Sequence, residues 1–151
     1  MNIDLSQTPE KFHHMKDEIL PILVELLKKL TELEEKYAIT MNKNSSNSER
    51  LWAEYQEKYK EIILPICTEK LISRGYARSL SEPATYAYIN AASSKIDFIM
   101  KSAKKITIET HFAHGVDKKH QFSIIQTLDG WKIDSLKYGF EGETNWYIYH
   151  I

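Results

Sequence analysis

The fold is decided by residues 128–134, Leu128-Asp129-Gly130-Trp131-Lys132-Ile133-Asp134. The apolar-rich run 121–125 precedes this stretch. Asp-Gly is a strong hairpin signal, because both residues tolerate the positive φ of a tight primed turn. We therefore expect two antiparallel strands to meet at Asp129-Gly130. Alternation then predicts the faces of the second strand, with Trp131, Ile133 and Ser135 on one side and Lys132, Asp134 and Leu136 on the other.

Three further extended segments are predicted around this hairpin, at 95–101, 106–112 and 146–149, where apolar and polar residues alternate. The hairpin itself supplies strands at 122–128 and 131–138. Short turns, including Gly115-Val116-Asp117, favour antiparallel pairing of consecutive strands. The alternation indicates that one face of the sheet packs on helices while the other face is more polar.

The first half of the chain is typical of two amphipathic helices. Thr8-Pro9-Glu10 is a good helix start, since a capping hydroxyl is followed by proline at the first helical position. Downstream, apolar residues recur every three or four positions, at Ile19, Leu23, Leu26, Leu30, Leu33 and Tyr37. Pro21 would remove a backbone hydrogen bond, which predicts a kink or a restart of the helix nearby.

The polar segment 40–48 predicts a loop between the two helices. The second helix is expected to begin with Ser48 as its cap and to run to about Lys70, with an interruption at Pro65. Its apolar stripe consists of Trp52, Tyr55, Tyr59, Ile62 and Ile66. The two stripes would pack on each other, on the sheet or on both. A self-associating coiled coil is the alternative, although the seam is shorter than the usual run of about three to four heptads.

Helices followed by strands, with the irregular segment 74–83 between them, favour an α+β fold over an alternating α/β one. We expect N-terminal helices packed on a curved antiparallel β-sheet. The chain has 151 residues, which suits one domain spanning 1–151. Within it, 1–78 would be mainly helical and 90–151 mainly antiparallel sheet.

The composition is that of an ordinary globular protein. Its formal net charge is −1, from 20 Lys and Arg against 21 Asp and Glu, so it lacks the basic excess of a typical nucleic-acid-binding domain. The single cysteine, Cys67, excludes an intramolecular disulfide, and we interpret it as a small packed residue. The first residues do not form a signal peptide, and the longest apolar-rich run, 19–27, is too short to span a bilayer. We expect a cytoplasmic protein that binds neither nucleic acid nor membrane.

The candidate metal ligands do not converge within one strand. Glu109 and His111 point the same way, whereas His114 points oppositely and His120 lies further along the chain. A metal site would therefore need side chains from another strand. The histidine pair at 13–14 lies on a helix, where adjacent residues do not face each other. We expect neither a metal nor another cofactor.

No catalytic residue is predicted, since the chain has no Gly-x-Ser-x-Gly elbow and no Gly-rich phosphate loop. An acid–base pocket on the sheet is the alternative. Its lining would consist of Tyr86, Tyr88, Asp97, Glu109, His111 and Asp134. Carboxylates that alternate with apolar residues are also typical of any half-exposed sheet, which is the interpretation we favour.

Aromatic residues gather near the C-terminal end of the chain. Tyrosine and tryptophan combine a large contact area with a polar group, and they dominate binding hot spots. The candidate partner-binding residues are Phe140, Glu141, Glu143, Trp146, Tyr147 and Tyr149. Alternation on the last strand would let Trp146 and Ile148 fill the core while Tyr147 and Tyr149 face the opposite side.

Two amphipathic helices, a proline-containing irregular segment and a meander ending in Gly-Trp-x-Ile-Asp resemble a cone-shaped nuclear-transport-factor-two-like domain. Within that superfamily, the chain most resembles the bacterial immunity proteins associated with Rhs and contact-dependent toxins. The resemblance covers residues from about 50 to the end. It rests on Ile63-Leu64-Pro65-Ile66-Cys67-Thr68, on Ser79-Leu80-Ser81-Glu82-Pro83 leading to Tyr86, on Gly130-Trp131-Lys132-Ile133-Asp134-Ser135, and on Trp146.

This resemblance implies a protein, a monomer or weak homodimer, that binds a cognate toxin domain and neutralises it by stoichiometric complex formation, without turnover. An acidic patch around Glu141 and Glu143 would suit a basic toxin. The alternative within the superfamily is an isomerase or dehydratase that uses an open cone pocket. A third possibility is a ligand-free dimerisation module.

Overall fold

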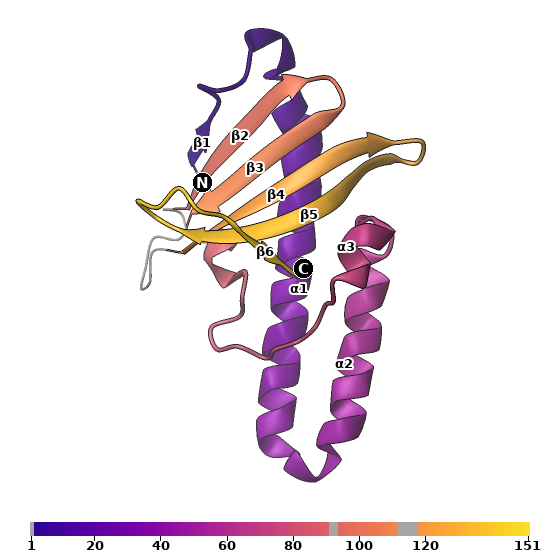
Figure 1. The fold of residues 1–151 in the computed structure, drawn as a ribbon. Coiled ribbons are helices and arrows are strands. Elements are labelled where there is room, and N and C mark those ends of the chain that lie inside the picture. Colours follow the sequence, from indigo (N-terminus) through magenta and orange to yellow (C-terminus); the bar gives the residue numbers. More distant parts are fainter. Residues whose placement is uncertain (1, 91–93, 112–117) are drawn as a thin grey trace.

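The computed structural model describes residues 2–90, 94–111 and 118–151, and it combines helices with one sheet (Figure 1). The helices are α1 (Met15–Lys43), α2 (Ser48–Ile63) and the short α3 (Glu69–Ser73). The strands are β1 (Asn2–Asp4), β2 (Lys95–Ser102), β3 (Lys105–His111), β4 (Lys118–Thr127), β5 (Gly130–Phe140) and β6 (Tyr147–Tyr149). The expected α+β class is confirmed.

The six strands lie in the order β1-β2-β3-β4-β5-β6. Every pair from β2 to β6 is antiparallel, as the short turns predict. β1 is a strand that the sequence pattern does not predict; it pairs in parallel with β2, where Asn2 lies opposite Lys95. His114 and the predicted turn at 115–117 lie outside the described residues.

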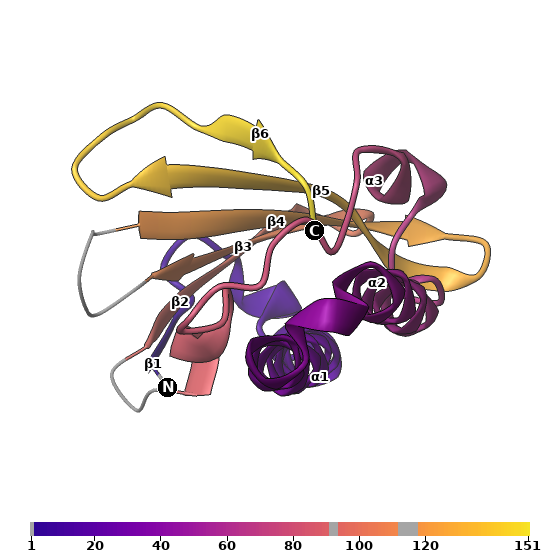
Figure 2. The ribbon, with the colours of Figure 1, turned by 90° about the horizontal axis from the view of Figure 1, so that it is seen from below.

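Helix α1 covers one face of the sheet, and α2 lies beside α1 (Figure 2). The buried face of the sheet meets the apolar stripe of α1, because alternate strand residues and every third or fourth helix residue point into the same space. This core includes Leu23, Leu26, Leu27, Leu30, Ile96, Phe98, Ile106, Ile108 and Phe122. The expectation that the helices pack on the sheet is confirmed.

The helix boundaries differ from those predicted. α1 continues through Pro21 to Lys43, so the predicted restart is wrong. Pro21 itself is exposed, and the packing of its buried neighbours Leu20 and Leu23 holds the helix together despite the lost backbone hydrogen bond. The loop is correspondingly shorter than 40–48. No helix within the described ranges is long and apolar enough to cross a membrane.

The second helix also ends earlier than predicted, at Ile63 instead of about Lys70. Ser48 is its first residue and not its cap; the preceding Asn47 makes no side-chain capping bond. The chain turns at Pro65, and α3 begins after Thr68, whose hydroxyl accepts a hydrogen bond from Leu71 N at 3.3 Å. The sequence predicts only an interruption of the helix at Pro65, whereas in the structure α2 ends just before this proline.

The β4–β5 hairpin forms at the predicted place with a different turn. Thr127 pairs with Gly130, so Leu128 and Asp129 are the two connecting residues. Gly130 has a φ of 101°, whereas neither connecting residue has a positive φ. The predicted primed turn is wrong: a turn without positive φ is followed by a left-handed glycine, the arrangement that commonly precedes a bulge.

A bulge in β5 changes which residues share a face. Ser123 pairs with Ser135 and Ile124 with Ile133, which leaves Asp134 as an extra residue. Leu136 therefore joins Ile133 in the core, and the predicted assignment of Leu136 to the opposite face is wrong. The bulge also meets the α2–α3 connection, since Ile133 N donates to Ile66 O at 2.8 Å and Thr68 N donates to Ile133 O at 2.9 Å.

Glu34 of α1 fixes the irregular segment that follows α3. Although its side chain is buried, its carboxylate accepts hydrogen bonds from Ser81 N at 3.2 Å, Thr85 N at 3.1 Å and Thr85 Oγ1 at 3.0 Å. A single acidic side chain thus accepts hydrogen bonds from an irregular segment, whose backbone N–H groups lack the partners that a helix or a sheet would provide.

Replacing Glu34 with alanine is expected to lower the free energy of unfolding by about 1–3 kcal/mol, because partly buried donors lose their acceptor. Urea unfolding followed by circular dichroism measures this change. Glu35→Ala is the matched control, since Glu35 is the exposed neighbour on α1 and should cost less than about 0.5 kcal/mol. Equal losses in the two variants would show that the Glu34 contacts do not stabilise the fold.

Candidate functional site

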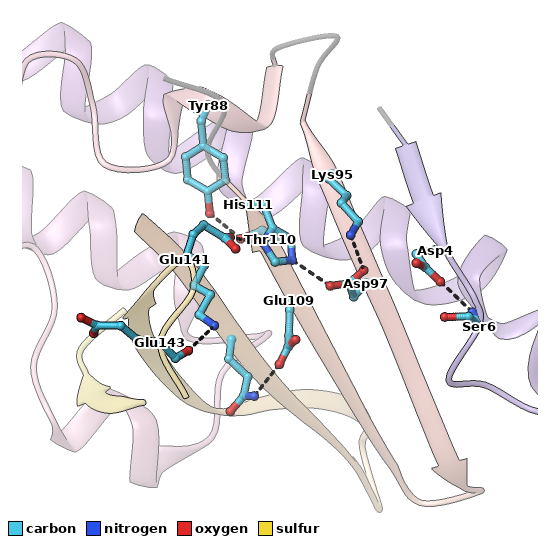
Figure 3. A network of polar contacts seen from close by, with 12 residues as sticks. Asp4, Ser6, Tyr88, Lys95, Asp97, Glu109, Thr110, His111, Glu141 and Glu143 are labelled. Atoms are coloured by element: carbon cyan, nitrogen blue, oxygen red, sulfur yellow. Dashed lines mark hydrogen bonds and ion pairs between the residues drawn. The ribbon is translucent and has the colours of Figure 1, made fainter. Parts of the chain in front are cut away.

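Three polar side chains of neighbouring strands meet on the face of the sheet turned away from α1. Asp97 of β2 lies opposite Glu109 of β3, and His111 follows two residues later on the same face of β3. Asp97 Oδ2 lies 2.8 Å from His111 Nε2, and one ligand atom from each of the three side chains lies within 4.8 Å of the others. We refer to Asp97, Glu109 and His111 as the β2–β3 cluster (Figure 3).

Neighbouring side chains hold this cluster in place. Lys95 Nζ lies 3.7 Å from Asp97 Oδ1, and Gln121 Nε2 donates to Glu109 Oε2 at 2.7 Å. Glu141, from the connection between β5 and β6, contacts His111 Nδ1 through its Oε1. Glu141 therefore belongs to the polar face of the sheet as well as to the predicted partner-binding residues.

The two tyrosines of the predicted pocket lie on the opposite side of the sheet, in the core. The Tyr88 hydroxyl is 2.5 Å from Thr110 Oγ1 and 2.8 Å from His120 Nδ1, and Tyr86 lies against the His120 ring. Burial raises the pKa of both tyrosines. Burial, assisted by the charge of Lys118, lowers the pKa of His120 to about 3. All these side chains are therefore neutral near neutral pH.

Asp134 lies apart from both groups, at the bulge of β5. Its carboxylate accepts hydrogen bonds from Thr68 Oγ1 at 3.0 Å and Lys70 Nζ at 3.1 Å. Burial would raise its pKa, but these hydrogen bonds and the charges of Lys70 and Arg74 outweigh burial and lower it. Of the six pocket residues predicted from the sequence, the structure thus brings together Asp97, Glu109 and His111.

Bulky side chains fill the space between the sheet and the helices near Tyr86. The cavity there, bordered by Tyr59, Tyr86, Tyr149 and Ile151, has a volume of about 10 Å³. That volume holds about one water molecule. Cys67 is likewise buried, and burial raises the pKa of its thiol to about 12, so it is a packed residue and not a nucleophile.

Trp146 packs against the outer face of β5. Lys119 Nζ lies 4.5 Å from the centre of the Trp146 ring and donates a hydrogen bond to Glu143 O at 3.1 Å. A Cβ atom on Gly139 would come within 3.1 Å of the indole and 3.0 Å of Asn145 O, so the glycine allows this close approach. Trp146 thereby holds the β5–β6 connection on the sheet.

The side chains of β6 are more exposed. Tyr147 is 43% exposed and Ile148 is 65% exposed, whereas Tyr149 is half-buried against Tyr138. Phe140, one strand away, is half-buried and also packs on Tyr138. The predicted faces of β6 are wrong: Tyr149 lies opposite the buried Leu136, whereas Ile148 lies opposite Lys137 and is exposed. Among the aromatic residues predicted to bind a partner, Tyr147 is the most exposed.

An open groove of about 530 Å³ runs beside β6, and two arginines contribute to its lining. Its residues are Arg74, Arg78, Tyr138, Ile148, Tyr149 and His150. We call this groove together with Tyr147 the C-terminal surface. The sequence pattern does not reveal Arg74 and Arg78 as site residues, because they follow α3 and lie about seventy positions before β6.

The comparison with known protein families matches nearly the whole chain. Residues 18–150 match the family described as NTF2 fold immunity protein. The α+β arrangement of helices and a mostly antiparallel sheet is consistent with that fold. Neither a curated protein nor a solved structure matches the chain significantly.

Proposed function

The chain belongs to the family of NTF2-fold immunity proteins, and from this premise we propose that it binds a cognate toxin domain and neutralises it. The neutralised species would be a one-to-one complex formed in the bacterial cytoplasm, with no turnover by this protein. The observation that carries the proposal is the family match over residues 18–150. The toxin would be a domain of the Rhs or contact-dependent type, as the sequence resemblance implies.

The C-terminal surface is our candidate for the interface. It combines the exposed apolar side chains of Tyr147 and Ile148 with the guanidinium groups of Arg74 and Arg78. Central aromatic and apolar anchors with charged residues around them are typical of binding hot spots. The arginines favour an acidic segment on the toxin, because complementary charge accelerates association and fixes the orientation of the partners.

Two observations favour binding over the alternative of an isomerase or dehydratase. Such an enzyme needs a carboxylate near a tyrosine or histidine within one pocket. Here Asp97, Glu109 and His111 lie on the outer face of the sheet, away from the cavity that Tyr86 borders on the opposite side. The cavity beside Tyr86 has a volume of about 10 Å³, far below the size of a substrate pocket.

Co-expression with the toxin domain encoded immediately upstream tests the proposal. We expect cells that make both proteins to survive, and the purified pair to elute as a one-to-one complex whose mass is measured by light scattering. A catalytically inactive toxin variant serves as the binding partner in the second experiment. Cell death on co-expression, together with separate elution of the two proteins, would contradict the proposed function.

A further inference from the structure

The β2–β3 cluster has the composition of a metal-binding site. Asp97 and Glu109 offer carboxylate oxygens and His111 offers an imidazole nitrogen, from adjacent strands of one rigid sheet. Ligands of one transition-metal ion lie on the order of 3–4 Å from one another, given bonds of about 2.0–2.2 Å. The ligand atoms of the cluster lie within 4.8 Å, so small side-chain rotations bring all three onto one ion.

His111 lies between two carboxylates of the polar face, one at each ring nitrogen. Nε2 faces the carboxylate of Asp97 and Nδ1 faces the carboxylate of Glu141. A metal ion bound by Nε2 and by Asp97 would leave Nδ1–H to donate to Glu141, which is how the second nitrogen of a ligating histidine is usually held.

Each candidate ligand also has a second partner that fixes its orientation. Glu141 contacts the distal nitrogen of His111, Gln121 holds one oxygen of Glu109, and Lys95 lies beside one oxygen of Asp97. Metal sites in proteins are typically supported in this way, and a carboxylate is one of the usual partners of the far nitrogen of the ligating histidine. The side chains of Asp97 and His111 are 14% and 16% exposed, which leaves access for an ion and for water.

We propose that Asp97, Glu109 and His111 bind one divalent transition-metal ion of the zinc class, oriented by Glu141. One imidazole with two carboxylates suits zinc and its neighbours in the first transition row better than calcium or magnesium, which prefer all-oxygen sites. The affinity for Zn²⁺ should accordingly exceed that for Mn²⁺, and Mg²⁺ should bind most weakly. This inference does not depend on the toxin, so the two proposals fail independently.

Calorimetric titration of the purified full chain with ZnCl₂ tests the site. We expect binding of one equivalent in the wild type and its loss in His111→Ala and Asp97→Asn. Glu109→Gln, which keeps the size of the side chain, should also weaken binding, and circular dichroism verifies that it folds. His14→Ala and Glu143→Gln are the controls, because they remove an exposed histidine and an exposed carboxylate from elsewhere and should bind Zn²⁺ as the wild type does.

The variant Glu141→Gln tests whether Glu141 orients His111 without being a metal ligand itself. It should keep the stoichiometry of one and raise the dissociation constant by about 10–100-fold, the usual effect of losing such a partner. X-ray absorption of the zinc complex should show one imidazole, oxygen ligands and no sulfur. No zinc binding by the wild type, equal binding by His111→Ala, or sulfur from Cys67 in the spectrum would each overturn the inference.

Discussion

The substitution Ile148→Asp is expected to disrupt the toxin complex while leaving the free energy of unfolding of the immunity protein almost unchanged. Ile148 is 65% exposed, so little of its side chain contributes to the core. In the complex, the aspartate would replace an apolar anchor and place a negative charge beside Arg74 and Arg78, where an acidic partner segment would then be repelled.

The expected loss is at least about 2 kcal/mol of binding free energy, or roughly 30-fold in Kd, as for a hot-spot residue. Ile39→Asp is the matched control, because Ile39 of α1 is also exposed, at 53%, and the chemical change is identical. Binding by calorimetry and stability by urea unfolding should be measured for both variants. Wild-type affinity in Ile148→Asp would exclude the C-terminal surface as the interface.

Trp146 should behave differently from Ile148, although both adjoin the same edge of the sheet. Its indole is held by Lys119 and lies close to Gly139, so its removal should lower stability through lost packing. The sequence places Trp146 and Tyr147 together as candidate partner residues. Substitutions on β6, such as Ile148→Asp, should therefore lower the affinity without lowering the stability, whereas substitution of Trp146 should lower the stability.

Acidification is expected to destabilise the wild type more steeply than a His120→Phe variant. Burial lowers the pKa of His120 to about 3 in the folded chain, whereas the unfolded chain has the ordinary histidine pKa of about 6.5. Between these values the unfolded state binds a proton that the folded state does not. The free energy of unfolding therefore falls as the pH falls through this window, by about 1.4 kcal/mol per pH unit.

Urea unfolding at pH 7.5, 5.5 and 4.5 measures this difference. The variant will lose some stability at every pH, because Tyr88 loses a hydrogen-bonding partner, so slopes and not absolute values are compared. Phe98→Leu is the control: it weakens the core and keeps His120, so its slope should match that of the wild type. Parallel slopes for the wild type and His120→Phe would show that His120 does not carry the pH dependence.

Local patterns predict most of the fold because they depend on one element at a time. Alternation indicates the strands from β2 to β6, and the stripe from Leu23 to Tyr37 indicates α1. The bulge at Asp134 is not predictable in this way, since one extra residue arises from the pairing with β4 and reverses the faces beyond it. β1 is missed for a related reason: its pairing with β2 joins residues more than ninety positions apart.

The candidate site, like the fold, is predictable only where local patterns decide it and not where tertiary contacts do. Alternation alone places Glu109 and His111 on one face of a strand, and a short β2–β3 turn is enough to bring Asp97 beside them. The contact between Glu141 and His111 requires the path of the β5–β6 connection, which the sequence pattern does not contain. Similarly, Arg74 and Arg78 reach β6 only through the docking of the α2–α3 connection on the β5 bulge.

The two outer strands of the sheet, β1 and β6, are each only three residues long. Very short edge strands are one of the ways in which sheets limit pairing with a second copy of the chain. An inhibitor that works one to one must be present in at least the amount of its target. The short edge strands are therefore one feature that would keep the chain dispersed at the concentration that the proposed one-to-one binding requires.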